Sequence, residues 1–267
     1  MLTDKDVTHW LANLVAAQRA NQKTGEPLGH KSKANLHALL SAALARAVDE
    51  EIIPRNVAKG QMLADKQESR EPVYLSIDDL DMLIATVGER YELFMAVLCK
   101  TGLRYNEATA LRKRDVRISQ GRATIHVTRA WKAGNDGKDV VGPPKTKKSR
   151  RSVACNAALS ADLAEHMRHL SPDDLLFTRP DGQYLRNSWF HKNVWGPMID
   201  TMVASGRFYE HPWIHEIRKA HTSHLLQAGI AVHVVQARLG HEDAQTTLNI
   251  YARLSQTDDL DAADALG

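Results

Sequence analysis

Residues 214–241 read IHEIRKAHTSHLLQAGIAVHVVQARLGH. The stretch predicts two helices, because Gly229 and Gly240 each follow a helix-length segment and suit the left-handed conformation of a helix C-terminus. His215 and Arg218 stand three positions apart, so the first helix places them on one face. The segment therefore predicts an imidazole beside a guanidinium near the start of a helix.

Helical patterns also predominate on either side of this stretch. Ser76 and Asp79 fit a capping box that begins a helix, and its apolar face is formed by Ile77, Leu80, Leu83, Ile84 and Val87. Gly102 follows Thr101 and suits the end of the next helix. The helix that ends before Gly102 is expected at about 91–100. Further helices are expected at about 106–112, 160–170, 187–203, 214–228, 231–239 and 243–251.

Strand patterns are confined to one region. Residues 123–128 (ATIHVT) and 150–154 (RRSVA) alternate between apolar and polar positions, and residues 134–137 (GNDG) are typical of a turn between two strands. The predicted fold class is therefore mainly α with a small antiparallel β-sheet.

The first seventy residues form a separate helical unit in this interpretation. Apolar residues at helical spacing indicate one helix around Trp10, Leu11, Leu14 and Val15. A second helix at 32–51 has an apolar stripe formed by Leu36, Leu39, Leu40, Ala43, Leu44 and Val48. The polar stretch 59–72 (KGQMLADKQESREP) looks like a linker. The predicted domains are residues 1–68 and residues 72–267.

Composition excludes several classes of protein. With 267 residues, 43% hydrophobic and 25% charged, the chain is close to the average of soluble globular proteins and is not mainly disordered. No stretch approaches the roughly 18 uncharged apolar residues of a membrane span, and the first residues lack a signal-peptide pattern. Cys99 and Cys155 are too few for a disulfide framework and are typical of reduced thiols. We therefore expect a cytoplasmic protein without a membrane partner.

The net charge of +3 conceals an uneven distribution. Residues 100–151 hold 15 Lys and Arg against four acids, a net charge of +11, so the rest of the chain carries −8. A strongly positive segment in a nearly neutral protein indicates a surface that binds a polyanion, with nucleic acid as the leading candidate. The alternative is a lysine-rich hairpin that interacts only with solvent.

Metal and nucleotide motifs are incomplete. The helix that begins at His215 resembles that of zinc proteases, but Lys219 stands where the second histidine is required. Without cysteine partners or a third ligand, two pairs at helical spacing are expected to be surface histidines: His211 with His215, and His221 with His224. Residues 134–139 lack the spacing of a phosphate loop, and no dinucleotide or serine-hydrolase motif occurs. The sequence predicts neither a cofactor nor a metal site.

Four elements occur in a characteristic order: TGLRYNEATAL at 101–111, HEIR at 215–218, LGH at 239–241, and Tyr251 ten residues after His241. This set resembles the tyrosine recombinase (phage integrase) family over about residues 72–255. The sequence PKTKKSRRSV at 144–153 is similar to the β-hairpin that carries a catalytic lysine in that family. The resemblance implies the family's catalytic fold, preceded by a short helical DNA-binding domain.

The resemblance also implies a mechanism. Tyr251 would attack a scissile DNA phosphate, forming a 3′-phosphotyrosine and releasing a 5′-hydroxyl. A free tyrosine has a pKa of about 10, so its phenolate costs about 4 kcal/mol at neutral pH and a base must take the proton. His215 is the implied base, Arg104 and Arg218 are the implied clamp on the phosphate oxygens, and His241 is the implied hydrogen-bond donor to the same phosphate.

The proton donor to the departing 5′-oxygen is implied to be Lys145, because the family's Lys-Thr pair aligns there. Lys147 and Lys148 crowd the same hairpin and stay open as alternatives. Glu107 matches an acidic residue of the family and is expected to orient Arg104 through an ion pair.

The sequence departs from the family pattern in two places. HEIR is followed by Lys219 and Ala220 where many relatives have a histidine directly, and we expect this difference to be tolerated. Residues 36–56 are similar to the last part of a helical core-binding domain, whose first helices look absent. A shortened DNA clamp is therefore expected in residues 1–68.

The resemblance implies a site-specific recombinase or integrase of a phage or other mobile element. It would act on double-stranded DNA as a homotetramer that holds two recombination sites, with accessory DNA-bending proteins as further partners. The place of action would be the nucleoid of a bacterial cell. A type IB topoisomerase-like strand-passage enzyme and a non-catalytic DNA-binding relative stay open as alternatives. The acidic tail 257–267 either docks on a neighbouring subunit, through Leu260, Ala263 and Leu266, or is a frayed end.

Overall fold

The computed structural model describes residues 2–15, 27–60, 70–134, 138–144 and 149–240. The chain divides into two compact units, Met1–Glu71 and Pro72–Gly267. None of the helices within the described ranges combines the length and the apolar character needed to cross a membrane.

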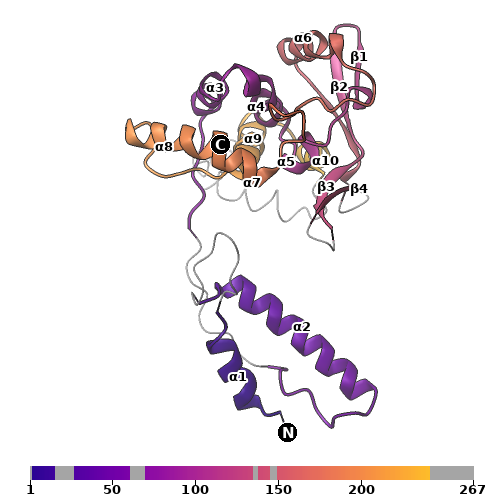
Figure 1. Ribbon diagram of the computed structural model, residues 1–267, viewed down its shortest axis with the longest axis vertical. Coiled ribbons are helices and arrows are strands. Elements are labelled where there is room, and N and C mark those ends of the chain that lie inside the picture. Colours follow the sequence, from indigo (N-terminus) through magenta and orange to yellow (C-terminus); the bar gives the residue numbers. More distant parts are fainter. Residues whose placement is uncertain (1, 16–26, 61–69, 135–137, 145–148, 241–267) are drawn as a thin grey trace, which may run out of the picture. The chain divides into compact units, whose positions relative to one another are not determined.

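The first unit contains helices α1 (Asp4–Ala12) and α2 (His30–Asp49) (Figure 1). Thr3 and Asp6 form a capping box at the start of α1. The small core consists of Val7, Leu11, Val57 and Ala58, with Leu14, Leu40 and Leu44 packed against it. The apolar stripe expected on α2 is only partly correct, because Leu39 is 69% exposed and Ala43 also faces solvent.

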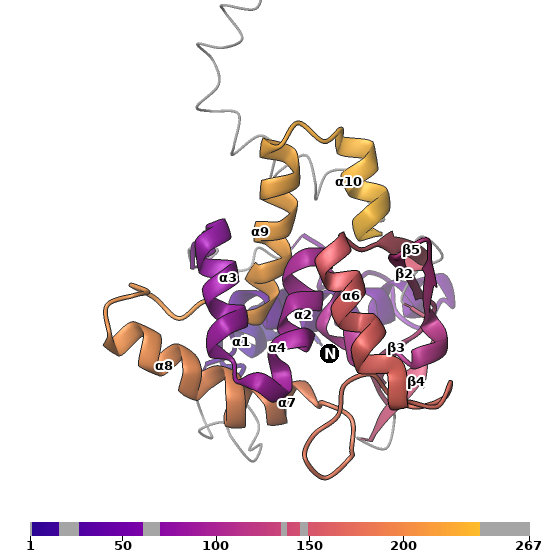
Figure 2. The ribbon, with the colours of Figure 1, turned by 90° about the horizontal axis from the view of Figure 1, so that it is seen from above.

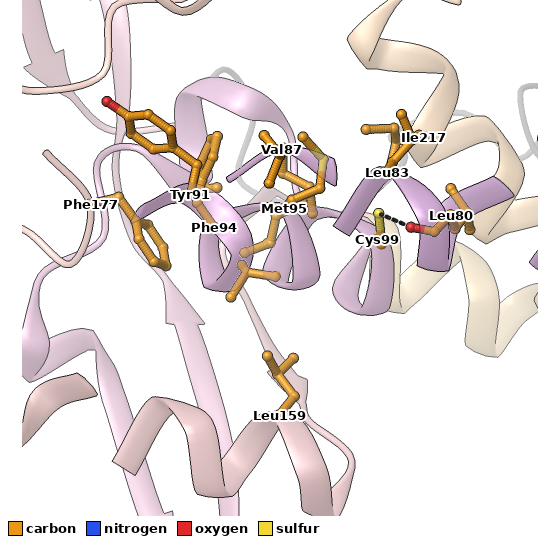
Figure 3. Close-up of a cluster of buried hydrophobic side chains, with 14 of the residues drawn as sticks. Leu80, Leu83, Val87, Tyr91, Phe94, Met95, Cys99, Leu159, Phe177 and Ile217 are labelled. Atoms are coloured by element: carbon orange, nitrogen blue, oxygen red, sulfur yellow. Dashed lines mark hydrogen bonds between the residues drawn. The ribbon is translucent and has the colours of Figure 1, made fainter. Parts of the chain in front are cut away.

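The second unit is built around α4 (Glu89–Thr101), which is apolar around most of its circumference and is therefore suited to full burial. It packs against α3 (Ile77–Thr86), α6 (Ala157–His166) and α9 (Ile214–Gln227). Leu83, Leu159 and Ile217 reach the same core from these three helices (Figure 3). The predicted capping box of Ser76 and Asp79 begins α3, but Ile77 lies outside the core and is 57% exposed.

A three-stranded antiparallel sheet has the order β1 (Val116–Ser119), β2 (Arg122–Val127), β5 (Arg151–Ala154). Helix α6 packs on β2, and the Ala123 main-chain N–H donates to Ser160 Oγ at 2.9 Å. A separate antiparallel hairpin pairs β3 (Ala130–Ala133) with β4 (Asp139–Gly142). The two strands recognised from the sequence, β2 and β5, pair with each other, but residues 134–137 stand between β3 and β4 in the chain and so do not connect β2 directly to β5.

The missed strands share a physical reason. β1, β3 and β4 are four residues long and are exposed or half-buried at nearly every position, so they lack the alternation that identifies a strand. β2 has the regular alternation of a strand with one buried face.

Residues 187–239 of the second unit are largely helical. The single helix expected at 187–203 is α7 (Asn187–Phe190), a π-helical turn η4 (His191–Trp195) and α8 (Gly196–Ala204). The helix expected at 106–112 is shorter, since α5 covers Tyr105–Ala108 and is followed by the 3₁₀ turn η1 (Lys113–Asp115). A second 3₁₀ turn, η3 (Met167–His169), directly follows α6.

Helices α9 and α10 (Val232–Leu239) pack against each other (Figure 2). Gly240 ends α10 in the left-handed conformation, with a φ of 65°. The helix expected at 243–251 lies outside the described residues. The prediction of a mainly α fold with a small antiparallel sheet is confirmed.

Candidate active site

A pocket of about 430 Å³ lies where the start of α5 meets the start of α9. Its polar lining consists of Arg104, Tyr105, Asn106, Asn187, His215 and Arg218. Three of the six residues that the sequence predicts for the site therefore share one pocket, although Arg104 and His215 are far apart in the chain.

Arg104 is placed by a sharp change of direction after α4. Gly102 ends that helix in the left-handed conformation, with a φ of 64°, and Arg104 is extended at the start of α5. The Arg104 side chain stays 38% exposed, and its Nη1 donates to Glu107 Oε1 at 2.9 Å. The ion pair expected between these two residues is present, and the Arg104 side chain also lines the pocket.

Glu107 is shared between two arginines, and the sequence prediction missed the second. Arg151 Nη2 donates to Glu107 Oε2 at 2.9 Å and Nη1 donates to Oε1 at 3.2 Å. Burial opposes ionisation of Glu107, but hydrogen bonds and charges from Arg151 and Arg104 outweigh it and hold its pKa below the usual 4.5. The alternation of 150–154 puts Arg151 on the same face of the strand as Val153, but it does not identify Glu107 as its partner.

Arg218 is almost fully buried, with 4% of its surface exposed. Its Nη1 donates to the Gly102 carbonyl, and its Nη2 donates to the Leu239 carbonyl at 2.6 Å. Burial and the positive charges of Arg104 and Arg151 lower its pKa, yet a guanidinium stays charged at neutral pH. Because carbonyls are neutral acceptors, these hydrogen bonds position the guanidinium without cancelling its charge.

His215 lies in the first turn of α9, is exposed, and lines the pocket. Desolvation lowers the pKa of His215 below 6.5, and the positive charges of Arg218, Lys219 and Arg104 lower it further. The shift therefore favours the neutral imidazole, which can accept a proton.

The other three predicted site residues, Lys145, His241 and Tyr251, lie outside the described residues. The structure does describe the end of α10, directly before His241. The Leu239 carbonyl there accepts a hydrogen bond from Arg218, so that end is tied to the pocket wall.

The surface location expected for His221 and His224 is wrong. His221 is 8% exposed, and its ring lies between the Cys99 carbonyl at 2.9 Å and Arg238 Nε at 3.3 Å. His224 is half-buried and donates from Nε2 to the Leu75 carbonyl at 2.9 Å. Both rings face inward from α9 and fasten it to main-chain carbonyls of neighbouring segments. His211, in contrast, is exposed beside Asp200.

No group of three or more His, Cys, Asp or Glu side chains in the described part of the chain is arranged to hold a metal ion.

Comparison with known sequences identifies relatives over most or all of the chain. The integrase of Mycobacterium phage L5 is 26% identical over 272 residues, which cover 100% of this chain and 70% of that protein. The ICEBs1 integrase of Bacillus subtilis (strain 168) is 27% identical over 285 residues, with 99% and 70% coverage. The tyrosine recombinase XerC of Shewanella sp. (strain ANA-3) is 28% identical over 211 residues, with 76% and 62% coverage.

Solved structures share the fold. The Tn1549 transposon integrase, in complex with a circular intermediate DNA, matches with a TM-score of 0.75 and 18% identity, over 93% of this chain and 80% of that chain. The XerH site-specific recombinase bound to difH matches with a TM-score of 0.62 and 20% identity, over 98% and 70%. These likenesses confirm that the catalytic unit has the tyrosine recombinase fold.

The model of the phage integrase family matches residues 74–258, which include the α5 and α9 segments that line the pocket. Since the match covers well over half of the chain and the fold agrees with it, this chain belongs to the phage integrase family of tyrosine recombinases.

Proposed function

We propose that the chain is a site-specific DNA recombinase of a phage or other mobile element, and that it breaks and rejoins DNA through a 3′-phosphotyrosine at Tyr251. The observation that carries the proposal is the pocket in which Arg104, Arg218 and His215 come together. When a hydroxyl group attacks a phosphodiester, two guanidinium groups can bind the phosphate oxygens and one proton acceptor can take the proton of the hydroxyl.

In the cleavage step the Tyr251 oxygen forms a bond to phosphorus, and the bond from phosphorus to the 5′-oxygen breaks. His215 takes the phenolic proton, and Lys145 gives a proton to the departing 5′-oxygen, with Lys147 or Lys148 as the alternative donor. Rejoining runs the same steps in reverse, with the 5′-hydroxyl as nucleophile. The covalent intermediate conserves the energy of the phosphodiester bond.

Charge in the pocket supports the same step. Arg104 and Arg218 would stabilise the charge that develops on the non-bridging oxygens, and His241 would donate a hydrogen bond to one of them. Arg218 is suited to this role because its acceptors are neutral carbonyls, and Arg104 because its side chain is partly exposed and lines the pocket.

The substrate is double-stranded DNA in this proposal. The positive segment 100–151 would contact the phosphates next to the cleavage site, and residues 1–68 would act as a helical DNA clamp. Related structures of the Tn1549 integrase and XerH contain bound DNA, which supports this assignment. We further propose that the protein works in the bacterial cytoplasm at the nucleoid, as a homotetramer on two sites, with accessory DNA-bending proteins.

A nicked duplex tests the proposal. The duplex carries the junction sequence of the mobile element, with the nick close to the cleavage position so that the released strand diffuses away. We expect a protein–DNA adduct that survives denaturation in wild type and is absent in Tyr251→Phe. Binding without any adduct would instead show a non-catalytic DNA-binding protein. Relaxation of supercoiled plasmid that lacks the site would indicate a type IB topoisomerase-like enzyme.

A further inference from the structure

Arg151 uses all three nitrogens of its guanidinium although its side chain is only 6% exposed. Two of them, Nη1 and Nη2, bind the Glu107 carboxylate. Nη1 also donates to the Ser149 carbonyl at 3.1 Å, and Nε donates to the Arg238 carbonyl at 2.7 Å. Arg151 therefore connects β5 to α5 and to the last turn of α10.

The contact with Glu107 has an electrostatic consequence for Arg104. The Glu107 carboxylate accepts from the Arg104 main-chain N–H at 3.0 Å and from Arg104 Nη1 at 2.9 Å, so it fixes both the backbone and the side chain of that residue. In a pair of Arg104 and Glu107 alone, the carboxylate would cancel the charge of the arginine. Arg151 supplies the compensating charge, so the three groups together keep a net charge of +1 beside the pocket.

The contact with α10 has a geometric consequence. The last carbonyls of a helix have no partner within the helix. At the end of α10 the Arg238 carbonyl accepts from Arg151, and the next one, of Leu239, accepts from Arg218. Two buried guanidinium groups therefore fix the point from which the chain leaves α10 toward Gly240.

We propose that Arg151 is a positioning residue that holds Arg104 charged and aimed at the pocket, and at the same time holds the end of α10 against the same site. It touches neither substrate nor the reacting atoms in this account. The inference rests on the proposed function, because it concerns the rate of DNA cleavage.

The test measures cleavage under single-turnover conditions with saturating protein on the nicked duplex, at a temperature where circular dichroism shows each variant to be folded. We expect Arg151→Gln to cleave about 10²-fold more slowly than wild type, because misplacement by about 1 Å has effects of that size. DNA binding should stay within about twofold of wild type, since Arg151 is buried.

Rescue separates positioning from a purely structural role. The double variant Arg151→Gln/Glu107→Gln should cleave at least about fivefold faster than Arg151→Gln alone, because the neutral amide no longer cancels the charge of Arg104. Arg151→Lys keeps the charge but cannot reach both Glu107 and the Arg238 carbonyl, so it should cleave about tenfold more slowly than wild type. This variant also serves if Arg151→Gln does not fold.

Arg179→Gln is the matched control. Its side chain is only 16% exposed and pairs with a carboxylate, Asp181, but it lies outside the pocket. We expect a lower Tm and an unchanged cleavage rate.

Two negative results have different meanings. Without any adduct in wild type, the proposed function fails. If wild type forms the adduct and folded Arg151→Gln or Arg151→Lys cleaves within threefold of it, only the positioning role is overturned. The positioning role is also overturned if Glu107→Gln brings no recovery.

Discussion

Positive charge is retained in the pocket because its arginines have different partners. Arg104 and Arg151 share the single carboxylate of Glu107, whereas Arg218 donates to carbonyls. These four side chains therefore sum to a net charge of +2, which favours a phosphate in the pocket lined by Arg104 and Arg218.

Replacing Arg104 by Lys tests the forked guanidinium. Lysine keeps the positive charge but offers a point donor, so it cannot bind two oxygens of one phosphate in parallel. We expect the single-turnover cleavage rate to fall by about 10²–10³-fold, the usual loss for one charge-stabilising donor, with folding unchanged. A rate within fivefold of wild type would show that Arg104 does not bind the reacting phosphate.

His221 is held in its neutral form. Nδ1–H donates to the Cys99 carbonyl, which leaves Nε2 as the acceptor for Arg238 Nε–H. Burial first, and then the charge of Arg238, lower the pKa of His221 to about 4. The folded protein therefore resists a proton that the unfolded chain takes up below pH 6.5.

Stability should consequently fall on the acid side. Neutral His221 contributes fully to the free energy of unfolding above about pH 6.5. This contribution is lost as the pH falls toward 4, by about 3 kcal/mol in total. Urea unfolding between pH 4.5 and 7.5 should show a flatter pH dependence for His221→Gln, on a lower overall stability. His233→Gln, which changes an exposed histidine of α10, should keep the wild-type slope. Equal slopes in all three proteins would contradict the assignment.

At the scale of elements, the C-terminal end of α4 is where α9 and α10 meet the catalytic pocket. A Cβ atom on Gly102 would lie 2.5 Å from His221 Cδ2 and 2.9 Å from Leu239 Cδ2. The Gly102 carbonyl also accepts from Arg218. The glycine is therefore required for its left-handed conformation and for the close approach of two helices.

Gly102→Ala should destabilise the protein more than Gly121→Ala. Both positions have positive φ, but Gly121 has nothing within 4 Å of its added Cβ, so it reports the conformational strain alone, about 1–2 kcal/mol. The clash at Gly102 should add a further 1–3 kcal/mol and slow cleavage through Arg218. Urea unfolding of both variants measures the difference. Equal losses of stability would contradict the close packing.

Elements with strong local signals could be predicted from the sequence, and weaker ones could not. The capping box at Ser76 and the glycines after α4, α9 and α10 give helix ends by local chemistry, and those ends are observed. Strands β3 and β4 are short and exposed, so nothing local distinguishes them from a loop. Which residues of α2 face solvent depends on the side of the helix that packs against the small core, and tertiary contacts determine that side.

At the scale of the molecule, the site joins segments that are distant in sequence. Ordered sequence motifs predict Arg104, His215 and Arg218 as site residues, and all three line the pocket. Arg151 was missed because its partners, Glu107 and the Arg238 carbonyl, lie 44 and 87 residues away. Sequence motifs therefore indicate which groups react, while the network that positions them requires the folded chain.

The uneven charge predicts salt-dependent DNA binding. The logarithm of the affinity for B-DNA falls by about 0.9 per phosphate contact for each log unit of salt. Neutralising Lys147 and Lys148, which belong to the positive segment, should reduce this slope by the amount that corresponds to the loss of up to about two phosphate contacts. The matched double variant Lys192→Gln/Arg207→Gln removes two exposed cations outside the segment and should leave the slope unchanged. Filter binding or fluorescence anisotropy over a salt series measures it, and an unchanged slope in the first variant would mean a solvated surface.

The residue that becomes attached to DNA tests the central claim most directly. Tryptic cleavage after Arg238 and Arg253 releases residues 239–253, LGHEDAQTTLNIYAR, which contain one tyrosine. Mass spectrometry of the trapped adduct, after nuclease and trypsin digestion, should show a nucleotide on Tyr251 of this peptide and none in Tyr251→Phe. A nucleotide on any other residue, or an adduct that persists in Tyr251→Phe, would contradict the account.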